Sequence, residues 1–327
     1  MTTPVLELRD LTVDIPTRHG TLRPVDNVSW DIAAGEILGV VGESGAGKSM
    51  TGNAVIGLLD PPAHISGGQV LLEGERIDNY TLPQMRKVRG KRIGMVFQDP
   101  LTSLNPLLTV GEQLEETILR HLDVSQDEAA ARAIRGLDEV GIPSAKNRMG
   151  AYPHEFSGGM RQRVVIALSL CAEPTLLIAD EPTTALDVSV QAQIIALLKR
   201  LCRERGMAAM LVTHDMGVIA ETADRVAVMY AGRLAEIGPV SQIVGHPRHP
   251  YTDGLMASTP AASAGNERLR QIPGAMPRLN ALPEGCAFHP RCPFAQDKCR
   301  KDPRPEVGAS DARAACWFPI EASEAVA

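Results

Sequence analysis

The sequence has no surplus of basic residues. Its 33 Lys and Arg stand against 39 Asp and Glu, so the formal net charge is -6 at pH 7. A protein that holds nucleic acid through its phosphates needs a positive field or a basic patch. The clusters of Arg in this chain are short. The charge pattern therefore argues against a nucleic-acid partner.

A leader segment and long apolar runs are missing as well. Acidic Glu7 and Asp10 lie where a secretory signal would have a basic region followed by an apolar one. The most apolar long stretch, residues 164–179, is interrupted by Glu173 and Pro174. A helix needs about 20 apolar residues to span a bilayer. These absences predict a cytosolic chain that does not cross a membrane by itself.

What the sequence does have is enough material for a full core. It contains 327 residues, of which 44% are hydrophobic and 22% charged, so it can form one large domain or one large and one small domain. After about Tyr251 the composition shifts to Pro, Gly, Ala and Arg with little periodicity. We therefore predict a main domain over residues 1–255 and a C-terminal extension over residues 256–327. No internal repeat is visible, which favours a single catalytic cassette.

Alternating strand and helix patterns predict an α/β fold with a mainly parallel core sheet. Apolar residues largely alternate from Leu6 to Ile15, which is typical of an N-terminal antiparallel part with one buried face. Residues 101–172 look mainly helical and predict an inserted helical subdomain over about 100–172. Further candidates are strands at 35–41, 70–72, 93–97, 176–179 and 208–212, and helices at 48–59 and 188–205. Ligands of such a sheet bind at its carboxyl edge.

Residues 42–49, Gly-Glu-Ser-Gly-Ala-Gly-Lys-Ser, match the spacing of a phosphate-binding loop. The glycines let several backbone N–H groups point at phosphate oxygens, helped by the N-terminus of the following helix. Lys48 would neutralise the β and γ phosphates of ATP, and Ser49 would ligate Mg²⁺. A chance glycine-rich turn is disfavoured because the segment joins an apolar strand to a helix. The predicted nucleotide contacts here are Gly42, Glu43, Ser44, Gly45, Ala46, Gly47, Lys48, Ser49 and Met50.

Two adjacent acids, Asp180 and Glu181, follow the apolar run 176–179. At the end of a buried strand, Asp180 is suited to hold the hydration shell of Mg²⁺, and Glu181 to polarise an attacking water. A pair of solvated acids is the alternative interpretation, and the phosphate loop upstream disfavours it.

A helix start at Ser157-Gly158-Gly159-Met160 could receive an anion. Ser157 is a good N-cap residue, and the two glycines leave the N–H groups of the first turn open. A capped helix start without a ligand is the commoner meaning of such a segment.

Six motifs in a fixed order resemble the motif set of ABC ATPases. They are the phosphate loop, Gln98, Ser157-Gly158-Gly159, Asp180-Glu181, Ala185-Leu186-Asp187 and His214. The resemblance implies that two cassettes sandwich two ATP molecules, so that the segment 157–160 of one subunit completes the phosphate site of the other. It also implies that Gln98 contacts Mg²⁺ and the γ-phosphate, that His214 is a second catalytic residue, and that Asp187 belongs to the nucleotide site.

Two positions depart from that family pattern. Many ABC ATPases have Gln where this chain has Met160. An aromatic residue that stacks on adenine is usual shortly after the first strand, but Ile15 occupies that place and no Tyr, Phe or Trp precedes Trp30. Arg18 or His19 is the alternative adenine contact. Trp30 itself lies in an alternating segment that predicts a core strand.

More specific stretches resemble the ATPase subunits of oligopeptide and dipeptide importers. These stretches are 98–106, 180–187, 248–252, 285–286 and 289–293. The resemblance implies a second, non-identical ABC ATPase, two integral-membrane permeases and an extracytoplasmic solute-binding protein. It places the chain as a peripheral protein on the cytoplasmic face of the bacterial inner membrane. Alternatives are import of nickel, haem or a sugar, a soluble non-transport ABC ATPase, and a module that binds nucleotide without turnover.

Four of the six cysteines crowd the C-terminal region: Cys286, Cys292, Cys299 and Cys316. In a cytosolic chain, metal or cluster binding is favoured over disulfides for such a group. The spacing leaves iron–sulfur and zinc open, and close Cys-x2-Cys pairs typical of zinc are absent. The family resemblance implies a [4Fe–4S] cluster on these four thiolates, with zinc or unliganded thiols as alternatives.

Overall fold

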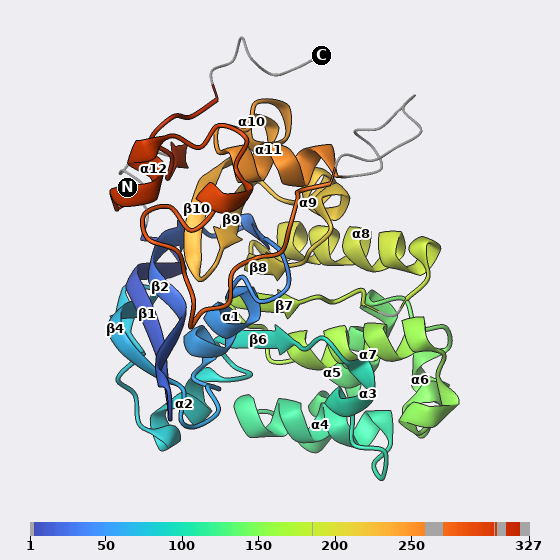
Figure 1. Ribbon diagram of the computed structural model, residues 1–327. Coiled ribbons are helices and arrows are strands. Elements are labelled where there is room, and N and C mark those ends of the chain that lie inside the picture. Colours follow the sequence, from blue (N-terminus) through green and yellow to red (C-terminus); the bar gives the residue numbers. More distant parts are fainter. Residues whose placement is uncertain (1–2, 185, 259–270, 304, 306–311, 321–327) are drawn as a thin grey trace. The chain divides into compact units, whose positions relative to one another are not determined.

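The computed structural model describes residues 3–184, 186–258, 271–303, 305 and 312–320 (Figure 1). The chain divides into two compact units, each assembled from separate stretches of sequence. The first unit contains residues 1–5, 32–36 and 79–211, and the second contains residues 6–31, 37–78 and 212–327. Each unit has its own sheet segment and its own helices.

An antiparallel sheet in the second unit is built from N-terminal residues. Its strands follow the order β2 (Gly20–Ile32), β1 (Leu6–Thr17), β4 (His64–Leu72) and β5 (Glu75–Arg76). Trp30 is buried in β2, as predicted for a core strand residue.

A bulge in β1 explains why the apolar positions of that strand change parity. Leu8 and Leu11 are both buried although they are three residues apart. The register between β1 and β4 shifts between Arg9 and Thr12, and Asp10 there has a positive φ of 51°. One extra residue in the bulge returns the apolar side chains to the buried face.

A second group of strands in the same unit leads to the phosphate loop. Its order is β11 (Arg313–Ala314), β10 (Arg233–Pro239), β9 (Arg225–Tyr230) and β3 (Ile37–Val41). β3 runs parallel to β9, and all five residues of β3 are buried. The accompanying helices are α1 (Lys48–Ile56), α9 (Met216–Thr222), α10 (Val240–Gly245), α11 (Pro250–Ala257), α12 (Asp297–Lys301) and the 3₁₀ turn η3 (His289–Arg291).

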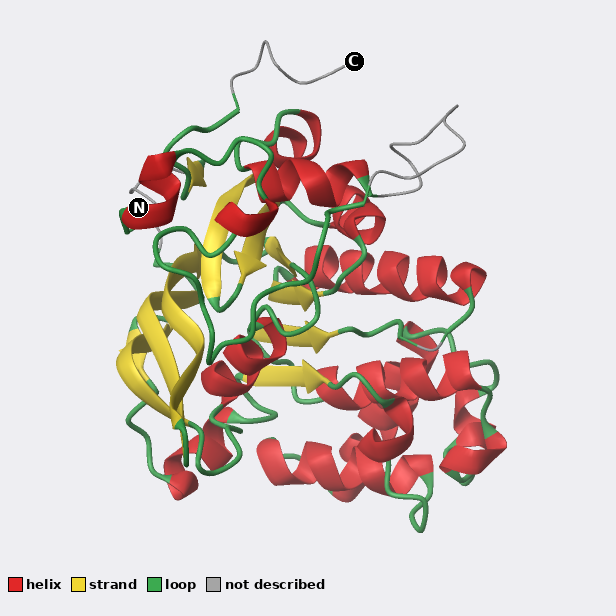
Figure 2. Cartoon of the chain, viewed as in Figure 1, coloured by secondary structure: helices red, strands yellow, loops and turns green. Residues whose placement is uncertain are grey.

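The first unit is largely helical and includes the whole of the predicted helical block, about residues 100–172 (Figure 2). Its strands are β8 (Ala208–Val212, the last residue excepted), β7 (Leu176–Asp180) and β6 (Ile93–Val96), with β6 parallel to β7. Its helices are α2 (Leu82–Val88), α3 (Pro100–Ser103), α4 (Val110–His121), α5 (Gln126–Glu139), α6 (Ala145–Arg148), α7 (Gly158–Leu170), α8 (Val188–Arg205) and the turn η1 (Pro153–Glu155).

Local signals set the ends of two helices that carry functional segments. α8 has the predicted bounds because Asp187 caps its start and Gly206, in the left-handed conformation, ends it. α1 is shorter than predicted: Gly57, with φ of 68°, ends it at Ile56. The N–H of Leu58 then bonds to the carbonyl of Asn53, which completes the cap.

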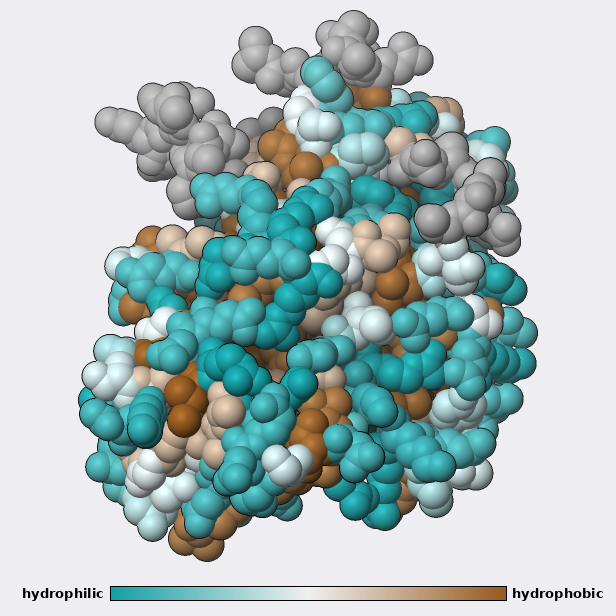
Figure 3. Space-filling view, turned by 180° about the vertical axis from the view of Figure 1, so that it is seen from behind, coloured by the Kyte–Doolittle hydropathy of each residue, from teal (hydrophilic) through white to brown (hydrophobic). Residues whose placement is uncertain are grey.

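The predicted α/β class, with parallel core strands and an N-terminal antiparallel part, is confirmed. The boundary near residue 255 and the subdomain over about 100–172 stay predictions. No helix in the described ranges is both long and apolar enough to cross a bilayer. The face seen in Figure 3 is mostly hydrophilic, and its hydrophobic residues lie in small separate groups.

Candidate nucleotide site

The phosphate loop connects β3 to α1 in a backbone shape that only glycine adopts easily. Gly42, Gly45 and Gly47 have φ values of 151°, 82° and 103°. A Cβ on Gly42 would lie 2.3 Å from the carbonyl oxygen of Met229, and one on Gly47 would lie 2.3 Å from that of Pro24. The neighbouring backbone is therefore packed against the loop, which fixes the loop's curvature.

Lys48 closes the loop from inside. Its side chain is buried, with 6% exposed, and its ammonium donates to the carbonyl oxygens of Gly42 at 2.8 Å and Glu43 at 3.1 Å. The positive charge is thus held within the curve of the backbone, at the N-terminus of α1. Both features favour an anion there.

Gly47→Ala tests how far the backbone conformation of the phosphate loop depends on glycine at position 47. We expect a loss of at least about 2 kcal/mol in the free energy of unfolding, because left-handed strain adds to the clash with the Pro24 carbonyl. Thermal unfolding measures the loss. Gly245→Ala is the matched control, because it lies in α10 with open space around its Cβ position. Equal unfolding temperatures for the two variants would contradict the argument.

His214 also belongs to the second unit, directly after β8. It is exposed. Its neighbour Thr213 is tied to β3 by a hydrogen bond from its N–H to the carbonyl of Val40 at 3.2 Å, and the Thr213 hydroxyl accepts the N–H of Asp215. These bonds hold the backbone on both sides of His214, whose predicted catalytic role stays a prediction.

In the first unit, Asp180 and Glu181 lie at the carboxyl end of β7, as predicted. Asp180 is buried, with 8% exposed. Glu181 has a φ of 46°, which is uncommon for a residue with a side chain and costs of order 1–3 kcal/mol. The amide of Gln98 donates to its carboxylate at 3.0 Å, and the Thr184 hydroxyl donates at 2.9 Å. The carboxylate is therefore oriented by donors on two other segments.

The predicted anion-binding helix start is the N-terminus of α7. Ser157 is its N-cap and accepts the N–H of Met160 at 3.4 Å. A Cβ on Gly159 would lie 2.7 Å from Val190 at the start of α8, so a glycine is needed for that close approach. Asp187 accepts the N–H of Val190 and caps α8. Ala185, between Asp180-Glu181 and Asp187, lies outside the described residues.

Two parts of the chain match known families. Residues 25–184 match the family described as ABC transporter, and residues 235–299 match the one described as oligopeptide/dipeptide transporter, C-terminal region. The oligopeptide transport ATP-binding protein OppD of Haemophilus influenzae is 46% identical over 97% of this chain and 98% of its own length. The dipeptide transport ATP-binding protein DppD of Bacillus subtilis is 45% identical over 98% of this chain and 96% of its own.

The chain belongs to the ATP-binding subunits of oligopeptide and dipeptide ABC transporters. A solved dimer of the ATP-binding cassette MJ0796 bound to ADP and Pi is 29% identical, with a TM-score of 0.65, and the match covers 72% of this chain and 98% of that one. The predicted ABC-type fold is thereby confirmed. The assignment of individual residues to the nucleotide site of this ABC subunit stays a prediction.

The four C-terminal cysteines do not form the cluster site that the sequence suggested. They line a cavity of about 20 Å³, which has room for about one water molecule and not for four iron and four sulfur atoms. Among the described residues of this ABC subunit, no group of three or more His, Cys, Asp or Glu side chains is disposed to hold a metal ion. The predicted [4Fe–4S] cluster on Cys286, Cys292, Cys299 and Cys316 is wrong, and so is the zinc alternative.

Two of these thiols, Cys292 and Cys316, have a packing role instead. Burial raises the pKa of Cys292 and of Cys316 to about 11, so both remain protonated near neutral pH. A protonated thiol behaves as a small apolar side chain. Elsewhere, Cys202 is buried and Cys171 is partly buried.

Two side-chain contacts with Glu43 of the phosphate loop were not predicted from the sequence. The hydroxyl of Tyr251 and the guanidinium of Arg291 both reach Glu43. In the sequence, the segments 248–252 and 289–293 contributed only to the resemblance to peptide-importer ATPases, and no contact with the phosphate loop was predicted for them. Arg18 and His19, the alternative adenine contacts, are exposed after Ile15, which is half-buried in β1, and their role stays a prediction.

Proposed function

We propose that this chain binds and hydrolyses Mg-ATP to power the import of oligopeptides or dipeptides. The observation that carries the proposal is the preformed phosphate loop with buried Lys48, in a chain that matches peptide-transport ATP-binding proteins over nearly its whole length. Uptake would use two permeases and an external solute-binding protein, with this chain on the cytoplasmic face of the membrane.

Each of the two units carries side-chain oxygen donors of a kind that suits magnesium. The hydroxyl of Ser49 and the carboxylate of Asp180, together with the amide oxygen of Gln98, are hard oxygen ligands of the kind that Mg²⁺ prefers. When bound with ATP, the ion would neutralise charge on the β and γ phosphates. Ser49 directly follows Lys48 at the start of α1, so one turn of helix supplies both the cation and the hydroxyl.

In the proposed reaction, water attacks the γ-phosphorus and the bond to the β–γ bridging oxygen breaks, giving ADP and phosphate. Glu181 orients the water and accepts its proton. Gln98 and Thr184 hold the Glu181 carboxylate in place. Lys48 and the loop N–H groups stabilise charge that develops on the phosphates. His214 contacts the γ-phosphate.

The segment Ser157–Met160 would complete the phosphate site of a second cassette, which we propose to be a non-identical chain. The position of this segment at the start of α7 supports the role, since the N-terminus of a helix attracts phosphate. Closure of the two cassettes on ATP would then drive the permeases.

Reconstitution in proteoliposomes with the two permeases, the binding protein and the second cassette tests the transported solute. We expect ATP-dependent accumulation of a labelled tripeptide, and we expect the peptide-loaded binding protein to stimulate ATP hydrolysis. A preparation without the second cassette is the control, and it should show neither activity. Accumulation of nickel, haem or a sugar in place of peptide would contradict the proposal.

A further inference from the structure

Side chains of the C-terminal region, meaning residues 235–299, contact the phosphate loop from outside. The loop and these side chains all belong to the second unit. The hydroxyl of Tyr251 accepts the N–H of Glu43 at 2.9 Å. The guanidinium of Arg291 forms a two-pronged ion pair with the carboxylate of Glu43, with both N–O distances at 3.0 Å. Glu43 is the second residue of the loop, so both its backbone and its side chain are fixed from outside.

Arg291 is buried, and its N–H groups donate hydrogen bonds to several different acceptors. Its side chain is 7% exposed. Besides Glu43, it donates to the carbonyl of Pro273 at 2.8 Å and to the hydroxyl of Tyr230 at 3.3 Å. Burial lowers the pKa of Arg291, but the hydrogen bonds with Glu43 and Tyr230 outweigh burial and the net shift is upward. The side chain is therefore a permanent cation that joins the loop to the chain at Pro273.

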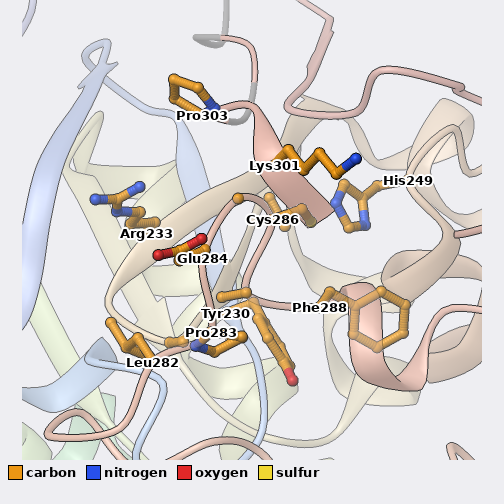
Figure 4. Close-up of a pocket in the computed structure, with 14 residues that line it drawn as sticks. Tyr230, Arg233, His249, Leu282, Pro283, Glu284, Cys286, Phe288, Lys301 and Pro303 are labelled. Atoms are coloured by element: carbon orange, nitrogen blue, oxygen red, sulfur yellow. The ribbon is translucent and has the colours of Figure 1, made fainter. Parts of the chain in front are cut away.

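Three aromatic rings support this ion pair. Tyr230 contacts Tyr251 with ring centroids 4.6 Å apart, and Phe288 lies 5.2 Å from Tyr230 and 5.4 Å from Tyr251. Tyr251 is fully buried. Figure 4 shows Tyr230 and Phe288 on the wall of a cavity of about 540 Å³ that the C-terminal segment encloses with β9 and β10. Because these three rings pack against one another beside Arg291, they restrict the movement of its side chain.

A second contact reaches the tip of the loop. A Cβ on Gly45 would lie 3.2 Å from the terminal methyl of Met276. Met276 therefore lies beside Gly45, and Pro273, three residues earlier, accepts a hydrogen bond from Arg291. Glu43 and Gly45 are both loop positions whose neighbours come from beyond residue 250.

The charge at Glu43 matters because the loop must receive a triphosphate. Its N–H groups, Lys48 and the start of α1 all favour negative charge. A bare carboxylate on the loop's second residue would oppose it. The bidentate pairing with Arg291 cancels that charge and holds the carboxylate in one direction.

We propose that Arg291 is a positioning residue for ATP binding, which acts by neutralising and fixing Glu43, so that the folded C-terminal region sets the nucleotide affinity of the phosphate loop. The inference rests on the proposed role of that loop in binding ATP. It gives the C-terminal region a task within this subunit, since without it the loop would carry an uncompensated carboxylate.

A charge-compensation series on the full chain tests the proposal. Arg291→Gln is expected to raise the KM for ATP and the Kd of a fluorescent ATP analogue about tenfold, with kcat at saturating ATP changed less than about twofold. Glu43→Gln removes the carboxylate of the loop residue itself and is the reference for the double variant, and its KM for ATP is expected to be no higher than that of wild type. The double variant Glu43→Gln with Arg291→Gln should return to the values of Glu43→Gln, because no bare carboxylate then remains.

Two further variants separate charge from fold. Arg291→Lys keeps the cation and should raise the KM less than about threefold. Arg300→Gln removes a charge from an exposed site in α12 and should leave the KM unchanged. An unchanged KM in Arg291→Gln would overturn the proposal. So would a double variant, or an Arg291→Lys variant, as impaired as Arg291→Gln, since the role of Arg291 would then be one of folding alone.

Measuring ATP affinity also makes the test of this inference independent of the test of the transport function. The measured quantity is ATP affinity relative to wild type, so a failure to import peptides would overturn the proposed solute without changing the result of the series. Conversely, equal affinities across the series would overturn the inference and leave peptide import standing.

Discussion

Glu181→Gln is expected to lower kcat for ATP hydrolysis by about 10² to 10⁴ while ATP binding stays within about twofold of wild type. Gln has nearly the same shape as Glu but cannot accept the proton of the attacking water, and general-base catalysis contributes this range of rate. The positive φ of Glu181 belongs to its backbone, so the substitution leaves that geometry in place. The loss therefore falls on chemistry and not on folding.

Phosphate release by the chain paired with its second cassette measures this effect. Glu204→Gln is the matched control, since Glu204 is an exposed glutamate of α8 in the same unit. Gln98→Ala should give a smaller loss, because it removes the Gln98 donor to the Glu181 carboxylate and leaves the Thr184 hydroxyl in place. ATP turnover that survives Glu181→Gln would remove Glu181 from its catalytic assignment.

Lys48→Ala should raise the Kd for ATP more than about 100-fold. Two losses combine in this variant. The charge-assisted bonds of Lys48 to the phosphates disappear, and hydrogen bonds to charged groups contribute about 1.5 to 3 kcal/mol each. The hydrogen bonds that Lys48 donates to the carbonyls of Gly42 and Glu43 are lost too. The variant therefore removes both the positive charge and the contacts that stabilise the loop from inside.

Equilibrium binding of a fluorescent ATP analogue measures this change, and thermal unfolding without nucleotide reports on the fold. Lys146→Ala is the control, because Lys146 is an exposed lysine in α6. An affinity within about tenfold of wild type would show that the loop binds phosphate through its backbone alone, contrary to the prediction.

The sequence was a good guide wherever the relevant residues are neighbours in the chain. The phosphate loop adopts left-handed glycine conformations at positions that its spacing predicted, and α8 begins at its cap and ends at its glycine. The predicted end of α1 at residue 59 was wrong, because Gly57 adopts the left-handed conformation and ends the helix at Ile56. The bulge at Asp10 was likewise invisible, since it depends on the register with β4.

The cysteines show how spacing alone can mislead. Four thiols close together in sequence are compatible with a metal site, but the fold decides whether they meet as ligands or pack as apolar groups. Here they surround a cavity of about 20 Å³. Burial raises the pKa of Cys292 and Cys316 and keeps them protonated. Composition could not reveal this, because it contains no information on burial.

The sequence by itself determined the phosphate loop and the ordered motifs of an ABC ATPase, because closely spaced glycines, a lysine and a helix start need only local backbone geometry. Only the tertiary structure decided what surrounds that loop. Tyr251 and Arg291 reach Glu43 from 208 and 248 residues away in the chain. Contacts of that separation exist only after β3, β9 and the C-terminal segment have packed together, since no local rule brings a buried arginine to a particular carboxylate.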